Sequence, residues 1–465
     1  MVFSSPVFLF LFLPIVFIFY FYFPKKETGI KNLILLIASL AFYVWGEPIF
    51  IFIMLFSIFI NWILSIYMNE EIKSKKNKII VIIATIYNIL ILFIFKYLTF
   101  TSKIIAEIAN NNSLIINITL PIGISFFTFQ IMSYIFDIYY GKVKPQKNIL
   151  NLTLYVSLFP QLIAGPIVRY ETIANEIENR KETSTDFSEG MIRFVCGLGK
   201  KVILSNYLAI IADNIFSMSG DISICTSWLG AICYTLQIYF DFSGYSDMAI
   251  GLGRIFGFHF DENFNYPYIS KSITEFWRRW HISLSSWFRD YIYIPLGGNR
   301  CSKSRHIFNL FIVWLLTGIW HGANWTFIIW GLFYFILLVL EKEIKFTSKL
   351  KGFGHVYTMF FVILAWVIFR ADSINSAFIY ISNMFGASGK LIDKAFLTYI
   401  KNGALQLIII SCILSTPIFK YIKEKNKISQ KTLDLIKGTS TVVLFIITLI
   451  LAVKSTYNPF IYFNF

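Results

Sequence analysis

Charged residues are scarce in this chain. They make up 14% of its 465 residues, whereas water-soluble globular proteins carry about 25%. Hydrophobic residues reach 57%, and the mean hydropathy is +0.66. A soluble globule of this length could not bury so much apolar surface, so the composition excludes a soluble protein and indicates an integral membrane protein.

Cysteine is also rare, and the few cysteines are scattered. They have neither the paired spacing of a metal site nor the even count of a disulfide framework. We therefore expect no metal site, no disulfide and five chemically inert thiols. These are Cys196, Cys225, Cys233, Cys301 and Cys412.

Internal repeats, low-complexity tracts and long polar linkers are absent from the sequence, so we expect one continuous membrane domain over residues 1–465. The lack of an inverted repeat argues against a transporter, because transporter folds are commonly built from paired halves. The first apolar run, within Met1–Phe23, has no basic residue before it and no small-residue cleavage site after it. We interpret it as a membrane span rather than a signal peptide.

Apolar runs near the roughly 20-residue length that crosses a bilayer recur along the sequence. The longer runs are Pro6–Phe23, Ile49–Met68, Ile79–Phe100, Trp228–Gly251, Ala323–Leu340, Val356–Phe369, Ala404–Phe419 and Val442–Val453. The short or interrupted runs are Leu33–Trp45, Leu114–Tyr140, Ile149–Pro166, Val202–Met218 and Phe308–Trp320. The sequence therefore predicts an all-α polytopic protein with about 9 to 12 transmembrane helices plus half-embedded and interfacial helices.

Basic residues outnumber acidic residues by 41 to 26. If the amino terminus faces outward, 34 of the 41 lie in the inward loops 24–32, 69–78, 141–148, 169–201, 254–306, 342–352 and 420–437. Positive-inside bias then predicts a multi-pass protein of the bacterial inner membrane with both termini on its outer face. Residues 370–402 would place four cations on the outer face unless this stretch lies flat at the membrane interface. Most loop cations are expected to contact anionic membrane lipid, and no nucleic-acid partner is expected.

Charge and aromatic side chains concentrate in residues 254–306, which have a formal net charge of +4. Arginine forks match phosphate oxygens, and aromatic faces can cover an adenine ring or an acyl arm, so this segment suits a polyphosphorylated or carrier-bound acyl donor. On one helix, Trp277, Trp280, His281 and Ser285 would share a face. The tryptophans could equally form an interfacial belt. The candidate donor-binding residues here and downstream are Trp277, Arg278, Arg279, Trp280, Arg289, Trp320, Asn324 and Trp325.

His321 is the strongest candidate for catalysis. It lies in the uncharged segment LTGIWHGANW, directly after a run too short to cross the bilayer. An ionisable residue at such a place is costly unless it faces a cavity, so a functional role is the default. Desolvation favours the neutral imidazole, which can accept a proton from a hydroxyl near pH 7. The flanking Gly318 and Gly322 would allow close approach of backbone or substrate.

The remaining polar candidates are weaker. Spacing alone favours a structural hydrogen bond for His281, and His259, His306 and His355 are interpreted as structural. Asp241 and Asp247 do not have the spacing of an ion site on one helix, so we expect them to make structural hydrogen bonds. The glycine-rich stretches Gly251–Gly257 and Gly386–Lys390 are similar to nucleotide loops but lack a preceding strand.

Several long motifs resemble the membrane-bound O-acyltransferase (MBOAT) superfamily, in particular its bacterial alginate O-acetylation (AlgI-like) branch. The resemblance covers almost the whole chain in order. It rests on the opening MVFSSPVFLFLFLP, LPIGISFFTFQIMSYIFDIYYG (Leu120–Gly141), LFPQLIAGPIVRY (Leu158–Tyr170), YFDFSGYSDMAIGLGRIFGF (Tyr239–Phe258), WRRWHISLSSWFRDYIYIPLGGNR (Trp277–Arg300), TGIWHGANW and the tail PFIYFNF. In the tail, Asn464 replaces the glutamine that is usual in the family.

The resemblance implies a helical bundle with a membrane-embedded funnel and a catalytic core segment over residues 254–321. The histidine of the WHG motif, His321 here, would be catalytic, and the histidine of the WRRWH segment, His281 here, would orient or polarise a reactant. The chain would move an acyl group, with acetyl favoured, from a cytoplasmic thioester toward a hydroxyl of an exported polysaccharide. His321 would act as the general base.

The same resemblance implies no permanently bound cofactor, with acetyl-CoA or another acyl thioester as co-substrate. The expected partners are an outer-face acetyltransferase or esterase-like protein and the polysaccharide synthesis and export machinery. Two alternatives stay open. One is D-alanyl transfer toward teichoic acid from an acyl carrier protein. The other, from a different class, is a polysaccharide-export channel or transporter in which His321 relays protons.

Overall fold

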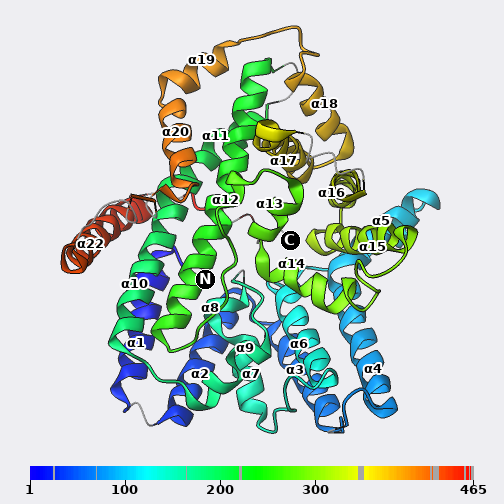
Figure 1. Cartoon of the computed structure of the whole chain (residues 1–465), viewed down its shortest axis with the longest axis vertical. Helices are drawn as coiled ribbons and strands as arrows, with labels where there is room; N and C mark the ends of the chain where they lie inside the picture. Colours follow the sequence, from blue (N-terminus) through cyan, green and yellow to red (C-terminus); the bar gives the residue numbers. More distant parts are fainter. Residues whose placement is uncertain are drawn as a thin grey trace. The chain divides into compact units, whose positions relative to one another are not determined.

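The computed structural model describes residues 1–24, 27–69, 71–163, 165–218, 222–343, 350–418, 421–422, 429–454, 457–459 and 461. Every regular element in these ranges is a helix, which confirms the predicted all-α class (Figure 1). Asn464 of the predicted family tail, and parts of the predicted loops 342–352 and 420–437, lie outside the described residues. The chain divides into two compact units, and the predicted single domain stays a prediction.

The first unit comprises residues 1–194 and 245–261. Its core is tied by a buried polar group, because the Tyr20 hydroxyl donates to Glu182 Oε1 at 2.5 Å and Lys31 Nζ lies 3.1 Å from the same oxygen. Its elements are η1 (Phe8–Phe12), α1 (Leu13–Tyr22), α2 (Thr28–Gly46), α3 (Ile51–Ile66), α4 (Lys75–Leu92), η2 (Phe93–Tyr97), α5 (Leu98–Ile108), η3 (Asn112–Leu114), α6 (Ile124–Tyr139), α7 (Ile149–Ser157), α8 (Phe159–Leu162) and α9 (Tyr170–Asn179).

The second unit comprises residues 195–244 and 262–465. The helices α10 (Ser184–Gly199) and α12 (Ile224–Ile255) contribute residues to both units. The other elements of this unit are η4 (Lys200–Ser205), α11 (Asn206–Phe216), η5 (Pro267–Ile269), α13 (Ile273–Arg279), α14 (Ile282–Phe288), η6 (Arg289–Tyr293), α15 (Lys303–His321), α16 (Trp325–Glu343), η8 (Lys351–Phe353), α17 (Gly354–Arg370), α18 (Ile374–Met384), α19 (Lys394–Lys401), α20 (Ala404–Leu414) and α22 (Gln430–Lys454).

Glycines allow α15 and α16 to pack closely in the second unit. A β-carbon on Gly331 would lie 2.4 Å from the Trp314 carbonyl oxygen, and one on Gly318 would lie 2.5 Å from the Phe327 carbonyl oxygen. Only glycine permits this approach of the two backbones. The helix α13 packs against both α16 and α17. These contacts bring the WRRWH segment and the end of α15 into one helical cluster.

Five helical segments of the described chain are long and apolar enough to cross a bilayer. They are Thr28–Gly46, Lys75–Ile108, Ser184–Phe216, Trp325–Glu343 and Asp434–Lys454. The pair α19 and α20, bent by 65°, would be a sixth. Four further apolar helices are shorter, namely Phe8–Tyr22, Ile51–Ile66, Ile124–Tyr139 and Gly354–Arg370. The multi-pass membrane character is thus confirmed, while the predicted number of crossings and the orientation stay predictions.

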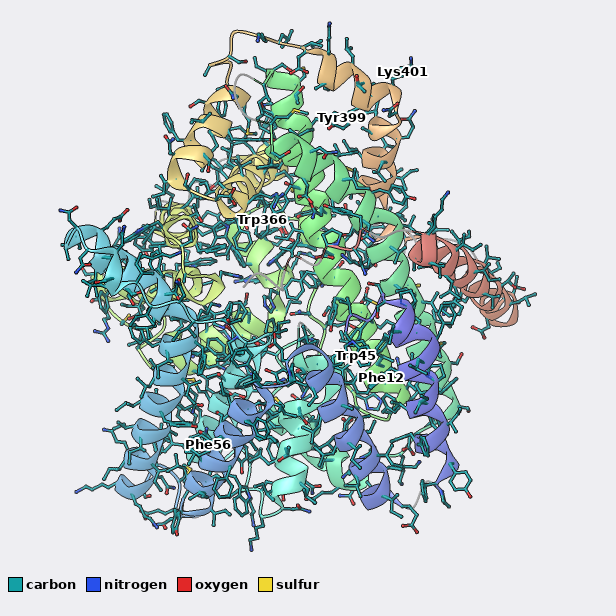
Figure 2. The ribbon with its side chains drawn as sticks, turned by 180° about the vertical axis from the view of Figure 1, so that it is seen from behind. Phe12, Trp45, Phe56, Trp366, Tyr399 and Lys401 are labelled. Atoms are coloured by element: carbon teal, nitrogen blue, oxygen red, sulfur yellow. The ribbon has the colours of Figure 1, made fainter. Side chains whose placement is uncertain are left out.

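The outer surface of the helices carries many large apolar side chains. Trp45 and Phe56, labelled in Figure 2, expose 62% and 58% of their surface, whereas Trp366 is buried. Exposed apolar surface on this scale is unfavourable in water but is favourable against lipid chains. The side-chain pattern therefore agrees with the composition in placing the helices in a bilayer.

A buried ion pair joins η4 to α12 within the second unit. Lys201 Nζ lies 2.5 Å from Asp241 Oδ1, and both side chains are about 1% exposed. The second carboxylate oxygen accepts from the Ile461 amide at 2.9 Å, and Lys201 also donates to the Pro459 carbonyl. These contacts agree with the structural role predicted for Asp241.

Candidate active site

His321 is the last residue of α15 and is 2% exposed. Three aromatic rings from different elements surround its imidazole edge-to-face. The ring centroids of Trp320, Trp330 and Phe369 lie 5.0, 4.9 and 5.2 Å from that of His321. The imidazole is therefore enclosed by aromatic side chains, as predicted for a histidine sheltered from water.

The aromatic group beside His321 holds several buried hydrogen-bond donors. The Trp277 ring of α13 contacts Trp330 and Tyr334 of α16, at centroid distances of 5.6 and 4.9 Å. Within the described part of the chain, no group hydrogen-bonds to Trp277 Nε1, Trp330 Nε1 or the Tyr334 hydroxyl. Buried donors are nearly always satisfied, so these three atoms are available to a substrate oxygen.

Sequence reasoning named Trp277 but missed Trp330, Tyr334 and Phe369. Each belongs to an apolar run that reads as a plain membrane span. No local pattern separates them from the other aromatic residues of those runs. Their contact with His321 and Trp277 arises only from the packing of α13, α15, α16 and α17.

The predicted helix face shared by Trp277, Trp280, His281 and Ser285 is wrong. The helix α13 ends at Arg279 and α14 begins at Ile282, with His281 between them in the left-handed region at φ +43°. The amide of Ile282 donates to the Asn263 carbonyl at 2.9 Å instead of continuing the helix. A tertiary contact therefore breaks a segment whose periodicity favours one helix.

The turn at His281 buries its ring, which is 1% exposed. The imidazole stands edge-to-face on Phe242, with centroids 4.7 Å apart, and lies 6.0 Å from the Trp320 ring. His281 lies outside the segments that could span a bilayer, and burial lowers its pKa to about 3. The imidazole is thus neutral near pH 7, because desolvation penalises its charged form.

Trp320 connects the two histidines. Its indole contacts the His321 ring at 5.0 Å and the His281 ring at 6.0 Å, both measured between centroids. His281 and His321, 40 positions apart in the sequence, therefore both contact Trp320 within the second unit. This arrangement brings together the two predicted catalytic histidines and the predicted residue Trp320.

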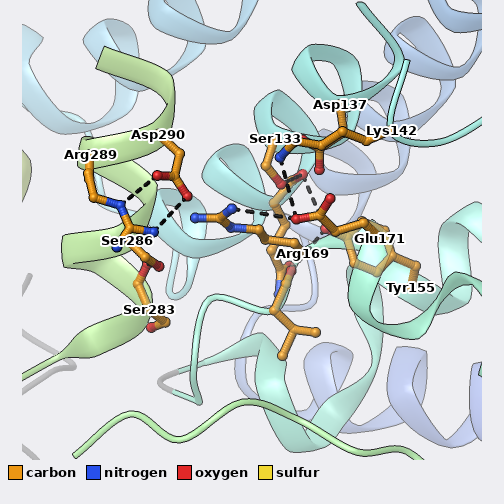
Figure 3. Close-up of polar contacts among 12 residues, drawn as sticks. Ser133, Asp137, Lys142, Tyr155, Arg169, Glu171, Ser283, Ser286, Arg289 and Asp290 are labelled. Atoms are coloured by element: carbon orange, nitrogen blue, oxygen red, sulfur yellow. Dashed lines mark hydrogen bonds and ion pairs between the residues drawn. The ribbon is translucent and has the colours of Figure 1, made fainter. Parts of the chain in front are cut away.

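The predicted donor-binding arginines lie around the α13 and α14 segment. Arg279 pairs with Glu275 one helical turn before it, at 2.9 Å. Arg289 donates to both carboxylate oxygens of Asp290, at 2.6 and 3.1 Å, as the left part of Figure 3 shows. Arg278 is exposed. Arg279 and Arg289 are thus partly neutralised by neighbouring carboxylates.

The other predicted donor-binding residues have diverse surroundings. Trp280 is buried against Trp366, with ring centroids 4.9 Å apart. Asn324 caps α16, because its Oδ1 accepts from the Thr326 amide at 3.1 Å while its Nδ2 donates to the Asp372 carbonyl at 2.9 Å. Trp325 is 50% exposed. Of these three, only Trp280 belongs to the buried aromatic cluster.

The start of α13 is held by a side chain that sequence reasoning also missed. Glu341 of α16 accepts hydrogen bonds from the amides of Ile273 and Thr274, at 2.6 and 2.8 Å, and from the Thr274 hydroxyl at 2.8 Å. The first amides of a helix have no intrahelical partner, so this carboxylate completes the helix end. Glu341 thereby fixes the segment that carries Trp277, Arg278 and Arg279.

The remaining candidates have structural partners. His259 contacts Glu176 at 2.7 Å, His306 contacts Glu343 at 2.8 Å, and His355 contacts the Ser270 carbonyl at 3.2 Å. Arg193 binds Asp247 at 2.9 Å. Among the residues whose placement is described, no group of three or more His, Cys, Asp or Glu side chains could hold a metal ion.

Apolar helices and two buried imidazoles in an aromatic cluster define a multi-pass membrane protein with a candidate site for proton transfer. Comparison with known sequences gives its class. The profile of the MBOAT, membrane-bound O-acyltransferase family, matches residues 142–381, which include His281 and His321. The chain belongs to this family and is an acyltransferase, which decides against the export-channel alternative.

Several curated relatives support the assignment. A probable alginate O-acetylase of Pseudomonas aeruginosa is 42% identical, over 88% of this chain and 80% of the relative. A peptidoglycan O-acetyltransferase of Helicobacter pylori is 32% identical, over 93% of this chain and 91% of the relative. A teichoic acid D-alanyltransferase of Bacillus subtilis is 31% identical, over 50% of this chain and 61% of the relative.

Proposed function

We propose that this acyltransferase moves an acetyl group from a cytoplasmic thioester toward a hydroxyl of an exported cell-surface polysaccharide. Two of the relatives described above are O-acetyl-transferring proteins that match most of this chain, and their names specify alginate and peptidoglycan. The observation that carries the proposal is the burial of His321 and His281 against one indole ring.

In the proposed reaction, His321 accepts the proton of the attacking hydroxyl. A hydroxyl attacks a thioester carbonyl well only when a base removes its proton during attack, a contribution of about 10² to 10⁴ in rate. The new ester C–O bond forms, the thioester C–S bond breaks, and the thiolate leaves with the proton that His321 has collected. The buried indole N–H groups of Trp277 and Trp330 are the proposed donors to the oxyanion that develops on the carbonyl.

The proposed donor is acetyl-CoA, used as a co-substrate rather than as a bound cofactor. The inward loops predicted from the charge distribution hold most of the basic residues. Basic side chains attract the phosphates of such a donor to the cytoplasmic face. We further propose that both termini face outward from a bacterial inner membrane. An outer-face partner of the polysaccharide machinery would then present the acceptor to this chain.

D-alanyl transfer from an acyl carrier protein is the second candidate. The teichoic acid D-alanyltransferase of Bacillus subtilis favours it, although that similarity covers half of this chain. The two candidates share the base and the reaction type. They differ in the donor, which is a small thioester in one case and a protein thioester in the other.

The test uses the purified full-length chain in lipid nanodiscs with radiolabelled acetyl-CoA or D-alanyl carrier protein. Alginate and peptidoglycan oligosaccharides serve as acceptors. We expect label transfer from acetyl-CoA, and His321→Ala should reduce it by about 10² to 10⁴. The matched control is His355→Ala, because the His355 ring contacts the Ser270 carbonyl at 3.2 Å. Transfer from the carrier protein alone would select the second candidate. Unchanged transfer by His321→Ala would refute the assigned base.

A further inference from the structure

Asn263 holds the turn on which His281 lies. It is 1% exposed and precedes η5 in the chain. Its main-chain carbonyl accepts from the Ile282 amide at 2.9 Å. Its side-chain Oδ1 accepts from the Ser283 amide at 3.2 Å and from the Ser283 hydroxyl at 2.9 Å. One asparagine therefore binds the first two residues of α14 through both of its oxygens.

The same side-chain atom faces the His281 ring. His281 Nδ1 lies 3.0 Å from Asn263 Oδ1. The two ends of an amide are distinguished by their partners. Here the Ser283 backbone amide can only donate, so the atom that faces it is the oxygen and not the nitrogen. An amide oxygen can only accept, and His281 Nδ1 must therefore be the donor.

This geometry places the proton of the neutral His281 ring on Nδ1. The Ser283 hydroxyl also lies 3.4 Å from Nδ1, but its closer contact is the 2.9 Å hydrogen bond to Asn263 Oδ1. A neutral imidazole carries one proton, so Nε2 is left as a bare acceptor. Within the described ranges, no group hydrogen-bonds to this buried Nε2 atom.

A buried acceptor without a partner is costly and uncommon in folded proteins. The ring is held in a left-handed turn and against two aromatic side chains, so Nε2 cannot turn toward Asn263 without breaking the contacts of the turn. A bound reactant can supply the missing donor. The carbonyl of a thioester cannot, because it has no hydrogen to give.

We infer that Asn263 is a positioning residue that fixes His281 as a hydrogen-bond acceptor, and that His281 Nε2 binds a hydroxyl of the acceptor sugar. The hydroxyl in question is a neighbour of the one that reacts, since the reacting hydroxyl gives its only proton to His321. This inference rests on the proposed function for the identity of the ligand. It excludes His281 as a group that polarises the thioester carbonyl.

The protonation state can be read without any activity. The full-length protein is labelled with ¹⁵N-histidine in lipid, and the His281 signals are identified by their loss in His281→Gln. Solid-state ¹⁵N spectra should show a protonated Nδ1 and a bare Nε2. Asn263→Ala should convert His281 to a mixture of both tautomers, while Ser283→Ala should leave the spectrum unchanged because the Ser283 amide still orients the asparagine. A protonated Nε2 in the unaltered protein would overturn the inference.

The ligand is tested by steady-state kinetics with acetyl-CoA and an oligosaccharide acceptor. Loss of one hydrogen bond corresponds to a roughly 10-fold rise in KM. Asn263→Ala should therefore raise the KM for the acceptor by about 10-fold and leave the KM for acetyl-CoA within about 2-fold. His281→Gln should retain more acceptor binding than His281→Asn. The amide oxygen of glutamine can reach the position of Nε2, whereas the shorter asparagine amide reaches only the position of Nδ1.

The possible failures are distinguishable. If Asn263→Ala raises the KM for acetyl-CoA instead, His281 serves the donor and the inference is wrong. If Ser283→Ala has the same effect as Asn263→Ala in both measurements, Asn263 only packs the turn, and the inference is again wrong. If the unaltered protein transfers no acetyl group, the proposed function fails, while the spectra still decide the position of the proton.

Discussion

Removal of the Glu341 carboxylate should loosen the start of α13 and with it the segment that carries Trp277. The carboxylate is 6% exposed and accepts three hydrogen bonds, two from the amides of Ile273 and Thr274. Hydrogen bonds to a charged group contribute about 1.5 to 3 kcal/mol each, and the contributions of neighbouring bonds do not simply add. Ser272 still caps the helix through the Glu275 amide. We therefore expect Glu341→Ala to lower the free energy of unfolding by about 3 to 5 kcal/mol.

The assay is unfolding of the purified full-length protein in detergent, followed by tryptophan fluorescence. Glu341→Gln keeps one acceptor oxygen in nearly the same shape and should lose about half as much stability. The matched control is Glu343→Ala at the same helix end, which removes one 2.8 Å contact with His306 and a 3.6 Å pair with the exposed Lys303. That change should cost about 1 kcal/mol. An equal loss in Glu341→Ala and Glu343→Ala would refute the reasoning.

Three further predictions concern the second unit. Burial lowers the folded-state pKa of His281 to about 3, so the unfolded chain binds more protons than the folded chain below about pH 6.5. This residue should therefore reduce the free energy of unfolding by about 1.4 kcal/mol for each pH unit from there down to about pH 3. Unfolding measured against pH should show a shallower acid slope in His281→Gln, and equal slopes would contradict the burial argument. Gly331→Ala would place a β-carbon 2.4 Å from a carbonyl of α15, so it should cost about 1 to 3 kcal/mol and lower acetyl transfer, whereas Gly352→Ala, with nothing within 4 Å, should match the unaltered protein in both assays. Lys201→Met should cost about 3 to 5 kcal/mol because it leaves the buried Asp241 carboxylate without its cation. The double change with Asp241→Leu should regain most of the loss in thermal unfolding, and a double variant no more stable than Lys201→Met would contradict this reasoning.

Much of the protein's character follows from composition and local sequence. Scarce charge and long apolar runs indicated a helical membrane protein, because neither depends on how the helices pack. His321 could also be singled out from sequence alone, since an ionisable residue beside a short uncharged run is costly without a function. The motifs around it carried the family resemblance that the comparisons confirmed.

The surroundings of that histidine could not be predicted. Periodicity describes the faces of one helix, whereas Trp330 and Phe369 reach His321 from two other helices. The contact of Trp330 depends on the close packing that glycines permit between α15 and α16. Contacts between helices are set by the fit of many side chains at once, and no short pattern encodes them.

The turn at His281 shows the same limit most clearly. Its local sequence favours one continuous helix, and the hydrogen bonds of Asn263, 18 residues upstream, end that helix at the histidine. Composition and local pattern thus determined that this is a helical membrane protein with a sheltered imidazole, and the motifs carried its resemblance to the acyltransferases. Only the tertiary structure decided how the two imidazoles are held, because a distant asparagine orients one ring and the packing of several helices encloses the other.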